Sequence, residues 1–405
     1  MFFFFFNFDK PATELLTGNK GEWAEIYIFL KLLVDGKVFA ADKNMQKIAE
    51  RYLRILRLFR EEIKDHRLEY IPGATIHVLT EGEPACPPIA SSDVSNAKDR
   101  VWRLISTTKR GNISDQDTQD FLRKMCIAKL KSPADGEGFF GGTKDIVMEV
   151  EDYKTGIASI VGFSCKSDFS GPATLFNASK NNTNFLFRVD GEIDDALAAE
   201  FNGMFDTRGS KQVVATARRM RLLKAHNCNL VFERAVEPAA RRNLAMVGGH
   251  GMSGTIAEML RHYYYDGEGA AAYCSIADLV HWVSAQNVCG VEDLGDIEDV
   301  YWYQVSHLLY AMFTGMRLGS AWSGRSSVNG GYIVARGDGE VLAYHTCIAD
   351  EFMDFLVQRL ALEQPSHSRH FSMRIEKFAD GKFYIKLPLQ IRFKSIRQSP
   401  DDDTE

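Results

Sequence analysis

An aspartate and a lysine on two neighbouring predicted strands are the residues of this sequence best suited to chemistry. Segments 144–150 and 158–166 alternate in the manner of strands and are joined by a polar turn that ends at Gly156. With the turn centred just before Gly156, Asp145 is expected to lie opposite Lys166. A carboxylate and an ammonium would then meet on one face of a hairpin.

The predicted pairing sorts this hairpin into two faces, because successive side chains of a strand point to opposite sides. The polar face carries Asp145, Glu149, Ser164 and Lys166. The apolar face consists of Ile146, Met148, Val150, Val161, Phe163 and Cys165. A slip of one residue would exchange the two faces, so the prediction depends on the register.

The polar face suits the hydrolysis of a phosphodiester. Such a reaction needs a divalent cation to polarise the phosphate and to lower the pKa of a water. Asp145 can supply an oxygen ligand of the kind that magnesium prefers, and Lys166 can hold the attacking water and offset developing charge. The alternative is a solvated cross-strand ion pair, worth only a few tenths of a kcal/mol.

A second carboxylate is expected on a helix over residues 18–35, which Asn19 can cap and after which Gly36 follows. Glu25 lies among apolar neighbours on nearly every side of this helix, so burial there would require a metal or a partner charge. Glu22 is a weaker candidate for the same role. For both residues the alternative is an acid in the first turn that complements the helix dipole.

Asp145 followed by Ser164-Cys165-Lys166 resembles the PD-(D/E)XK nuclease signature, and longer stretches resemble the HpaII-type restriction endonuclease family. The similar segments are 20–25 with the following helix and 37–42, 143–147, 162–167 with 172–179 and 183–185, 330–345, and 365–370 with 389–394. The general signature has an acid where this sequence has Ser164. The second metal-binding carboxylate must then come from elsewhere, and Glu25 is the candidate, since many members of the superfamily place a glutamate on such a helix.

The resemblance implies a mixed α/β PD-(D/E)XK-type nuclease core and magnesium-dependent cleavage of double-stranded DNA at a short site, CCGG being expected. Asp145 would bind Mg²⁺ with help from Glu25, Lys166 would activate water, and Ser164 would fill the place of the acid. A cognate methyltransferase is implied as functional partner, and a homodimer would explain cleavage of both strands of a palindrome. Two alternatives stay open: a repair nuclease of the same superfamily, and a DNA-binding protein that has lost catalysis.

The core is expected within a chain of four parts. These are a mainly helical part over 1–135, the nuclease core over 136–250, a helical and β-hairpin region with a DNA-recognition role over 251–395, and a disordered acidic tail over 396–405. Segment 43–65 is predicted as a basic amphipathic helix and 82–98 as a loop. Further helices are predicted at 114–130, 194–204, 209–226, 254–264, 275–285 and 298–314, and hairpins around Asp338-Gly339 and Asp380-Gly381.

A few residues are candidates for contact with DNA. Asn177 can read adenine, and Arg369 with His370 can read or approach a guanine edge. A basic run over 218–224 could follow phosphates, although a solvated helix face explains it as well. For Asn177, Arg369 and His370, ordinary turn chemistry is the competing interpretation.

The whole composition neither requires nor excludes DNA binding. The chain of 405 residues carries a net charge of −6, but DNA needs only a locally basic surface. Seven cysteines without close Cys or His spacing favour neither a disulfide framework nor a zinc site, and suit a reducing cytoplasm. No segment reaches the roughly 18 uninterrupted apolar residues of a membrane span.

Overall fold

The computed structural model forms two compact units, one of residues 1–173 and 327–352 and the other of residues 174–326 and 353–405. Each unit is described by itself. The residues described are 15–42, 44–63, 66–109, 111–131, 144–167, 174–179, 182–204, 211–267, 274–292, 295–326, 328–345, 349–365 and 373–394. The predicted acidic tail lies outside them.

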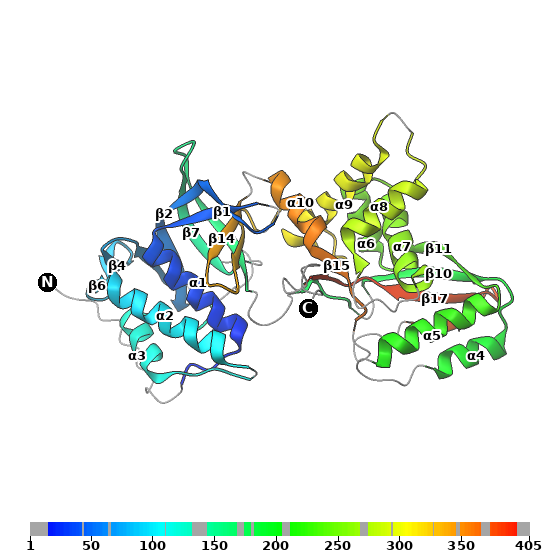
Figure 1. The fold of residues 1–405 in the computed structure, drawn as a ribbon, viewed down its shortest axis with the longest axis horizontal. Coiled ribbons are helices and arrows are strands. Elements are labelled where there is room, and N and C mark those ends of the chain that lie inside the picture. Colours follow the sequence, from blue (N-terminus) through cyan, green and yellow to red (C-terminus); the bar gives the residue numbers. More distant parts are fainter. Residues whose placement is uncertain are drawn as a thin grey trace, which may run out of the picture. The chain divides into compact units, whose positions relative to one another are not determined.

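The first unit combines three helices with strands from three regions of the chain (Figure 1). Its elements are α1 (Lys20–Asp35), β1 (Lys37–Ala41), β2 (Lys47–Ile63), β3 (His66–Ile71), β4 (Thr75–Thr80), β5 (Glu83–Pro84), β6 (Ile89–Ala90), α2 (Ser91–Thr107), α3 (Gln116–Lys124), β7 (Ile146–Asp152), β8 (Ala158–Ser167), β13 (Gly331–Ala335) and β14 (Val341–His345).

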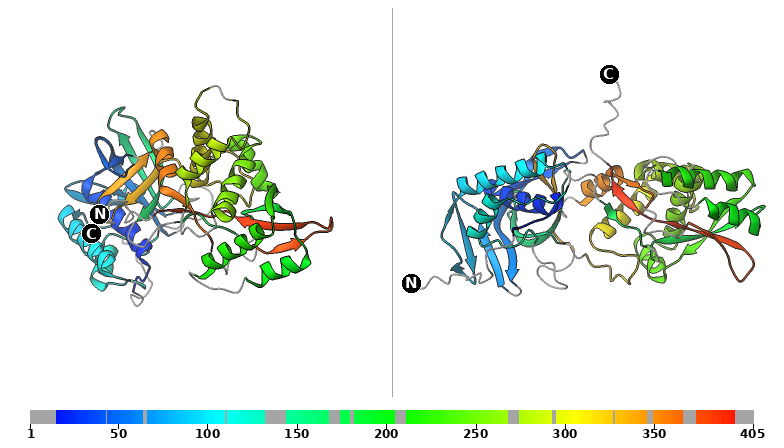
Figure 2. Two further views of the ribbon diagram at one scale, coloured as in Figure 1. Left: turned by 45° about the vertical axis from the view of Figure 1, so that its right-hand side comes forward. Right: turned by 90° about the horizontal axis from the view of Figure 1, so that it is seen from below.

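Six of these strands close into a ring in the order β1-β14-β13-β8-β7-β2, with β2 pairing back to β1. The β1–β14 and β13–β8 pairs are parallel and the other four are antiparallel. Strands β3, β4 and β5 extend the sheet from β2. Helix α1 packs against β8, β1 and β2, and α2 packs along α1, as Figures 1 and 2 show for the blue and cyan helices.

Local signals explain the limits of α1. Asn19 accepts hydrogen bonds from the backbone N–H groups of Gly21 and Glu22, and Glu22 accepts one from the Asn19 N–H, so the two form a capping box. At the other end Gly36 adopts a left-handed conformation, with φ of 61°, and ends the helix. Both ends were predicted from the sequence.

The predicted helix over 43–65 is wrong: this segment forms the 17-residue strand β2. The pairing of β2 with β7 shifts between Ile55 and Arg57, and its pairing with β3 shifts between Glu61 and Ile63. Each bulge adds a residue and interrupts the two-residue alternation by which a strand is recognised. The apolar residues that remain then fit a helical spacing, although long-range pairing decides the structure.

The predicted loop over 82–98 is also wrong at its end, because α2 begins at Ser91. The prolines before it stay outside the helix, and Ser91 to Asp93 form its first turn. Buried Val94, Ala97, Val101 and Ile105 recur at helical spacing. The serines and the aspartate favour a loop, but they form the first turn of the helix, where Asp93 complements the helix dipole.

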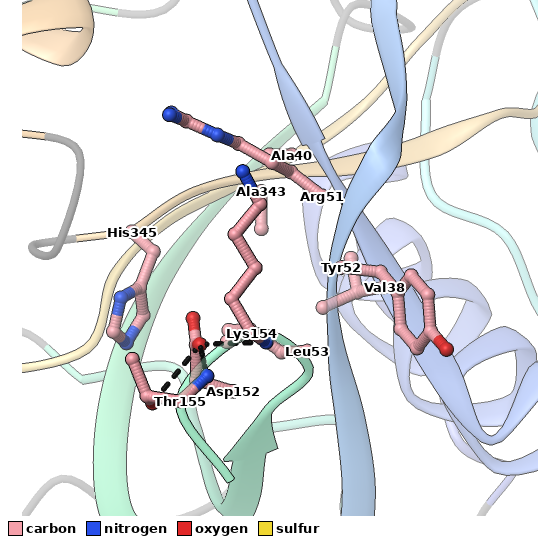
Figure 3. A pocket seen from close by; sticks show the side chains of 10 residues that line it. All are labelled: Val38, Ala40, Arg51, Tyr52, Leu53, Asp152, Lys154, Thr155, Ala343 and His345. Carbon is pink, nitrogen blue, oxygen red and sulfur yellow. Dashed lines mark hydrogen bonds between the residues drawn. The ribbon is translucent and has the colours of Figure 1, made fainter. Parts of the chain in front are cut away.

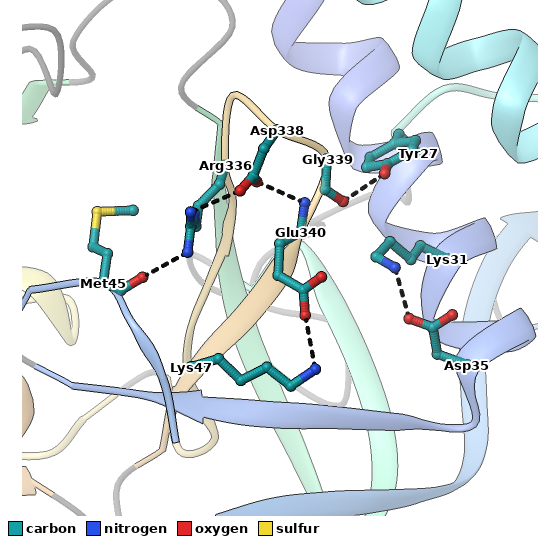
Figure 4. A network of polar contacts seen from close by, with 9 residues as sticks. All are labelled: Tyr27, Lys31, Asp35, Met45, Lys47, Arg336, Asp338, Gly339 and Glu340. Atoms are coloured by element: carbon teal, nitrogen blue, oxygen red, sulfur yellow. Dashed lines mark hydrogen bonds and ion pairs between the residues drawn. The ribbon is translucent and has the colours of Figure 1, made fainter. Parts of the chain in front are cut away.

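A polar network fixes the predicted Asp338-Gly339 turn against α1 (Figure 4). The Tyr27 hydroxyl on α1 donates a hydrogen bond to the Gly339 carbonyl at 2.6 Å, and Lys47 forms an ion pair with Glu340 at 3.4 Å. Arg336 donates to Asp338 in the same turn and to the Met45 carbonyl. These contacts hold the β13–β14 hairpin, and through it β8, in place beside α1.

The second unit contains two four-stranded sheets in the orders β11-β10-β17-β16 and β12-β15-β18-β9, with all their pairs antiparallel. The strands are β9 (Thr174–Phe176), β10 (Asn184–Asp190), β11 (Asn229–Ala235), β12 (Cys274–Ser275), β15 (Leu360–Leu362), β16 (Ile375–Lys377), β17 (Phe383–Pro388) and β18 (Ile391–Phe393). The helices are α4 (Asp195–Gly203), α5 (Lys211–Ala225), α6 (Pro238–Gly248), α7 (Met252–Arg261), α8 (Ile276–Gln286), α9 (Ile297–Phe313) and α10 (Ala349–Arg359), with a π-helical turn at His262–Asp266; α10 begins within the first unit's segment.

The mixed α/β class is thus confirmed, as are both predicted aspartate-glycine hairpins, which correspond to β13–β14 and β16–β17. The predicted helices correspond to α3, α4, α5, α7, α8 and α9. The described part of residues 1–135, predicted as mainly helical, contains six strands beside α1, α2 and α3.

Candidate active site

The β7–β8 hairpin pairs two residues closer to its turn than the sequence predicted. Ile146 pairs with Phe163 and Met148 with Val161, so Asp145 lies opposite Ser164 and not opposite Lys166. Because the shift is of two residues, each side chain stays on its predicted face. All six residues predicted for the apolar face are buried in the core.

The turn itself explains the shift. The side chain of Asp152 accepts hydrogen bonds from the backbone N–H groups of Lys154 and Thr155, and Gly156 takes a positive φ of 66°. The Asp152 N–H then bonds to the Ile157 carbonyl, which closes a four-residue loop. The sequence prediction placed the centre one residue too late because it gave no role to Asp152.

Asp145 lies immediately before β7 and is held at three points. Its N–H donates to the Phe163 carbonyl at 2.8 Å. One carboxylate oxygen accepts hydrogen bonds from the Cys165 N–H at 2.7 Å and from the Ser164 hydroxyl at 3.1 Å. Ser164 is buried, so its hydroxyl orients the aspartate and adds no negative charge at the place of the usual acid.

Glu25 is an electrostatic neighbour of both Asp145 and Lys166. The Glu25 side chain is 17% exposed, and its pKa is raised to about 7, first by burial and then by the negative charge of Asp145. The positive charges of Lys131, Lys166 and Arg60 act on Glu25 in the opposite direction. The fold therefore brings Glu25 of α1 to the end of the hairpin that carries Asp145 and Lys166.

Two carboxylates in this arrangement fit a hard divalent cation. Their mutual repulsion, which raises the pKa of Glu25, would be relieved by a cation between them. Within the described residues there is no cluster of three or more His, Cys, Asp or Glu side chains that could hold a metal. A site of two carboxylates matches magnesium, which keeps several of its waters.

Glu22, the weaker candidate, already has a structural role. Its carboxylate accepts the Asn19 N–H at 2.8 Å in the capping box, which is the helix-start explanation given for it from the sequence. The thiol of Cys165 is buried, and burial raises its pKa well above the usual range. This cysteine therefore stays protonated at neutral pH and is inert in the site.

Three polar residues that the sequence analysis did not single out lie next to this site. Lys131 approaches both Glu22 and Glu25 at 3.9 Å. Arg60 and Glu62 form an ion pair of 2.7 Å, with each residue only 4% exposed. Arg60 and Glu62 lie in segment 43–65, which the sequence predicts as a helix. No signal in the sequence therefore indicates that this pair lies beside the site.

The residues predicted to contact DNA are differently situated. Asn177 follows β9 in the second unit and is exposed. Arg369 and His370 lie outside the described residues. In the basic run, Arg219 is 3% exposed and donates to the Met373 carbonyl, so it is a core residue and does not follow phosphates. Burial lowers its pKa to about 10.

A separate hollow of about 200 Å³ is lined by residues of β1, β2, β14, the end of β7 and the β7–β8 turn (Figure 3). Its wall is apolar where Val38, Leu53 and Ala343 contribute, and Arg51 and Lys154 lie near its rim. It includes neither Asp145 nor Lys166, so it is distinct from the hairpin site.

Comparisons with known proteins establish the family of the chain. The family model described as HpaII restriction endonuclease matches residues 19–393. The chain belongs to the HpaII restriction endonuclease family. A curated relative is the type II restriction enzyme HpaII of Haemophilus parainfluenzae, which is 30% identical over 389 residues, covering 94% of this chain and 99% of the relative. No solved structure gave a significant match.

Membership of the HpaII restriction endonuclease family makes the protein a type II restriction endonuclease, an enzyme that hydrolyses DNA. This favours restriction over the two alternatives left open by the sequence, a repair nuclease and a DNA-binding protein without catalysis. In the part of the chain that the structure describes, no helix is both long and apolar enough to cross a membrane.

Proposed function

We propose that the enzyme cleaves double-stranded DNA at CCGG in a magnesium-dependent reaction at the end of the β7–β8 hairpin. The observation that carries this proposal is the Asp145 carboxylate, fixed by Ser164 and Cys165, with Glu25 near enough to feel the charges of both Asp145 and Lys166. The site sequence is that expected from the resemblance to the HpaII-type family, whose curated member HpaII is 30% identical.

Asp145 and Glu25 would hold Mg²⁺, which supplies polarisation of the scissile phosphate and a lower pKa for a bound water. Lys166 would hold the attacking water and offset negative charge that develops on the phosphate. Ser164 and the Cys165 N–H keep the Asp145 carboxylate in one orientation, so that less reorganisation is needed when DNA binds.

A restriction role carries further expectations for the cell. We propose that the enzyme acts in the cytoplasm and depends on a methyltransferase that protects CCGG sites of the host. Reading of the bases is assigned to the second unit, with Asn177, Arg369 and His370 as candidates. Cleavage of both strands of a palindromic site is most simply done by a homodimer.

Digestion of a plasmid rich in CCGG tests the proposal. Wild type should give discrete fragments with magnesium and none with a chelator, whereas Lys166→Ala and Asp145→Asn should lose at least about a thousandfold in rate, since each removes a group that acts on the reacting atoms. Discrete fragments from both variants at the wild-type rate would contradict the assignment of the hairpin. Fragments ending at another sequence would contradict CCGG alone.

A further inference from the structure

Lys131 lies at the edge of the candidate active site without being one of the family's signature residues. Its ammonium is 3.9 Å from the carboxylates of both Glu22 and Glu25, and its side chain is 58% exposed. Ion pairs that are this long and this exposed contribute little to stability. The lysine is therefore only weakly held by its carboxylate partners and is accessible from solvent.

The backbone that carries Lys131 is, in contrast, firmly held by the Arg60–Glu62 pair. Arg60 donates to the Lys129 carbonyl at 2.8 Å, while Glu62 accepts the Ala128 N–H at 2.9 Å. The pair thus contacts the loop through one donor and one acceptor. The guanidinium of Arg60 also lies 5.3 Å from the ring of Phe29 on α1, which connects the loop to the helix of Glu25.

Burial of two charges costs desolvation energy, and well-packed apolar residues often stabilise a core at least as well. The Arg60–Glu62 pair is therefore poorly explained by stability alone. Its particular effect is to fix the Ala128 N–H and the Lys129 carbonyl. These groups come just before Leu130, which is itself buried, and Lys131. The result is a loop with a firmly held base and an exposed cationic side chain next to the proposed metal ligands.

We propose that Lys131 binds a backbone phosphate of the DNA beside the scissile bond, and that the buried Arg60–Glu62 pair positions it. This inference rests on the proposed function, since DNA must approach Glu25 and Asp145 for its phosphodiester to reach the metal. A cation at Glu25 repels the ammonium of Lys131, and a phosphate arriving at the same edge attracts it. In this role Lys131 acts on binding, because the phosphate that it holds lies beside the scissile one.

The test measures kcat and KM on a duplex with one CCGG site over a range of salt concentrations. Lys131→Ala should raise KM about tenfold with kcat nearly unchanged, and should reduce the slope of log KM against log salt concentration by about one. Lys131→Arg should stay near wild type. Lys124→Ala removes another exposed lysine, in the last turn of α3, and serves as the matched control with no expected change.

The positioning role is tested with Arg60→Lys, which keeps the positive charge but loses the forked geometry that reaches both Glu62 and the loop carbonyl. It should raise KM as Lys131→Ala does, and the double variant should be no worse than Lys131→Ala alone. If the increases in KM caused by the two substitutions multiply in the double variant, Arg60 does not act through Lys131, and the positioning role is overturned. An unchanged KM for Lys131→Ala, or an equal rise for Lys124→Ala, would overturn the phosphate contact.

Failure of the proposed function can be told apart from failure of this inference. If Lys166→Ala still cleaves at the wild-type rate, the hairpin is not the active site, whatever Lys131→Ala does. If Lys166→Ala is inactive and Lys131→Ala has wild-type KM and salt dependence, only the inference fails.

Discussion

Ser164 occupies the place where related nuclease signatures carry an acid, and its contacts indicate a narrower role. Its hydroxyl donates to Asp145, which also accepts the Cys165 N–H. Ser164→Ala should therefore lower kcat by about tenfold and not abolish it, because one of two hydrogen bonds to the carboxylate remains. Ser159→Ala on the same strand, an exposed serine, should leave the rate unchanged. Complete loss on Ser164→Ala would mean that the hydroxyl itself takes part in the chemistry.

Glu25 is held in a position that costs stability when no cation is bound. Its pKa is about 7 in the folded chain and 4.5 in the unfolded one, so the folded state disfavours the charged form. The stability of the chelator-treated protein should therefore fall as the pH rises from 4.5 to 7, by about 3 kcal/mol at most. Glu25→Gln lacks this loss.

Urea unfolding with chelator present measures the difference between wild type and Glu25→Gln. The two should be about equally stable near pH 4, and the variant should be the more stable one at pH 8. Added magnesium should stabilise wild type more than the variant, because only wild type offers both carboxylates. If the difference in the free energy of unfolding between wild type and Glu25→Gln is the same at pH 4 and pH 8, Glu25 is not a buried carboxylate that becomes charged between these pH values.

At the scale of elements, the close approach of β13 and β14 requires a glycine. Gly331 has a φ of 129°, and a Cβ built there would lie 1.9 Å from the Tyr344 carbonyl oxygen, which is backbone and cannot move aside. Gly331→Ala should destabilise the protein by about 3 kcal/mol or more and should also reduce cleavage, since β13 pairs with β8 beside Phe163.

A matched control exists in the β16–β17 turn. Gly381 also has a positive φ, 78°, but a Cβ added there meets no atom within 4 Å. Gly381→Ala should cost only the local backbone strain, about 1 kcal/mol. Thermal unfolding compares the two variants, and equal losses would show that conformation alone, without the clash at Tyr344, accounts for Gly331.

How far the sequence predicts these elements depends on how local their causes are. The faces of β7 and β8 follow from alternation and survive a two-residue error in register. The end of α1 at Gly36 follows from local capping. Strand β2 could not be recognised, because its bulges break the alternation. Arg60 and Lys131 were missed for a related reason, since only the tertiary fold joins segments 71 residues apart.

At the scale of the whole molecule, a chain with a net charge of −6 must present its cations locally in order to bind DNA. The first unit carries Lys166 and Lys131 together with Asp145 and Glu25, so under the proposed function attraction of phosphate and binding of the cation would occur at one place. Such a local site would allow an acidic protein to cleave DNA although its net charge is negative.

Each chain offers a single hairpin with Asp145 and Lys166, whereas a palindromic site has two scissile phosphates. We expect two chains, each of 45.6 kDa, to bind one duplex that carries one CCGG. Sedimentation equilibrium of Lys166→Ala with such a duplex and magnesium measures this ratio without cleavage. A duplex with the site scrambled is the control and should not give the same stable ratio. One chain per duplex at saturation would contradict the homodimer, and the two strands would then be cut in successive encounters, with nicked circles accumulating during plasmid digestion.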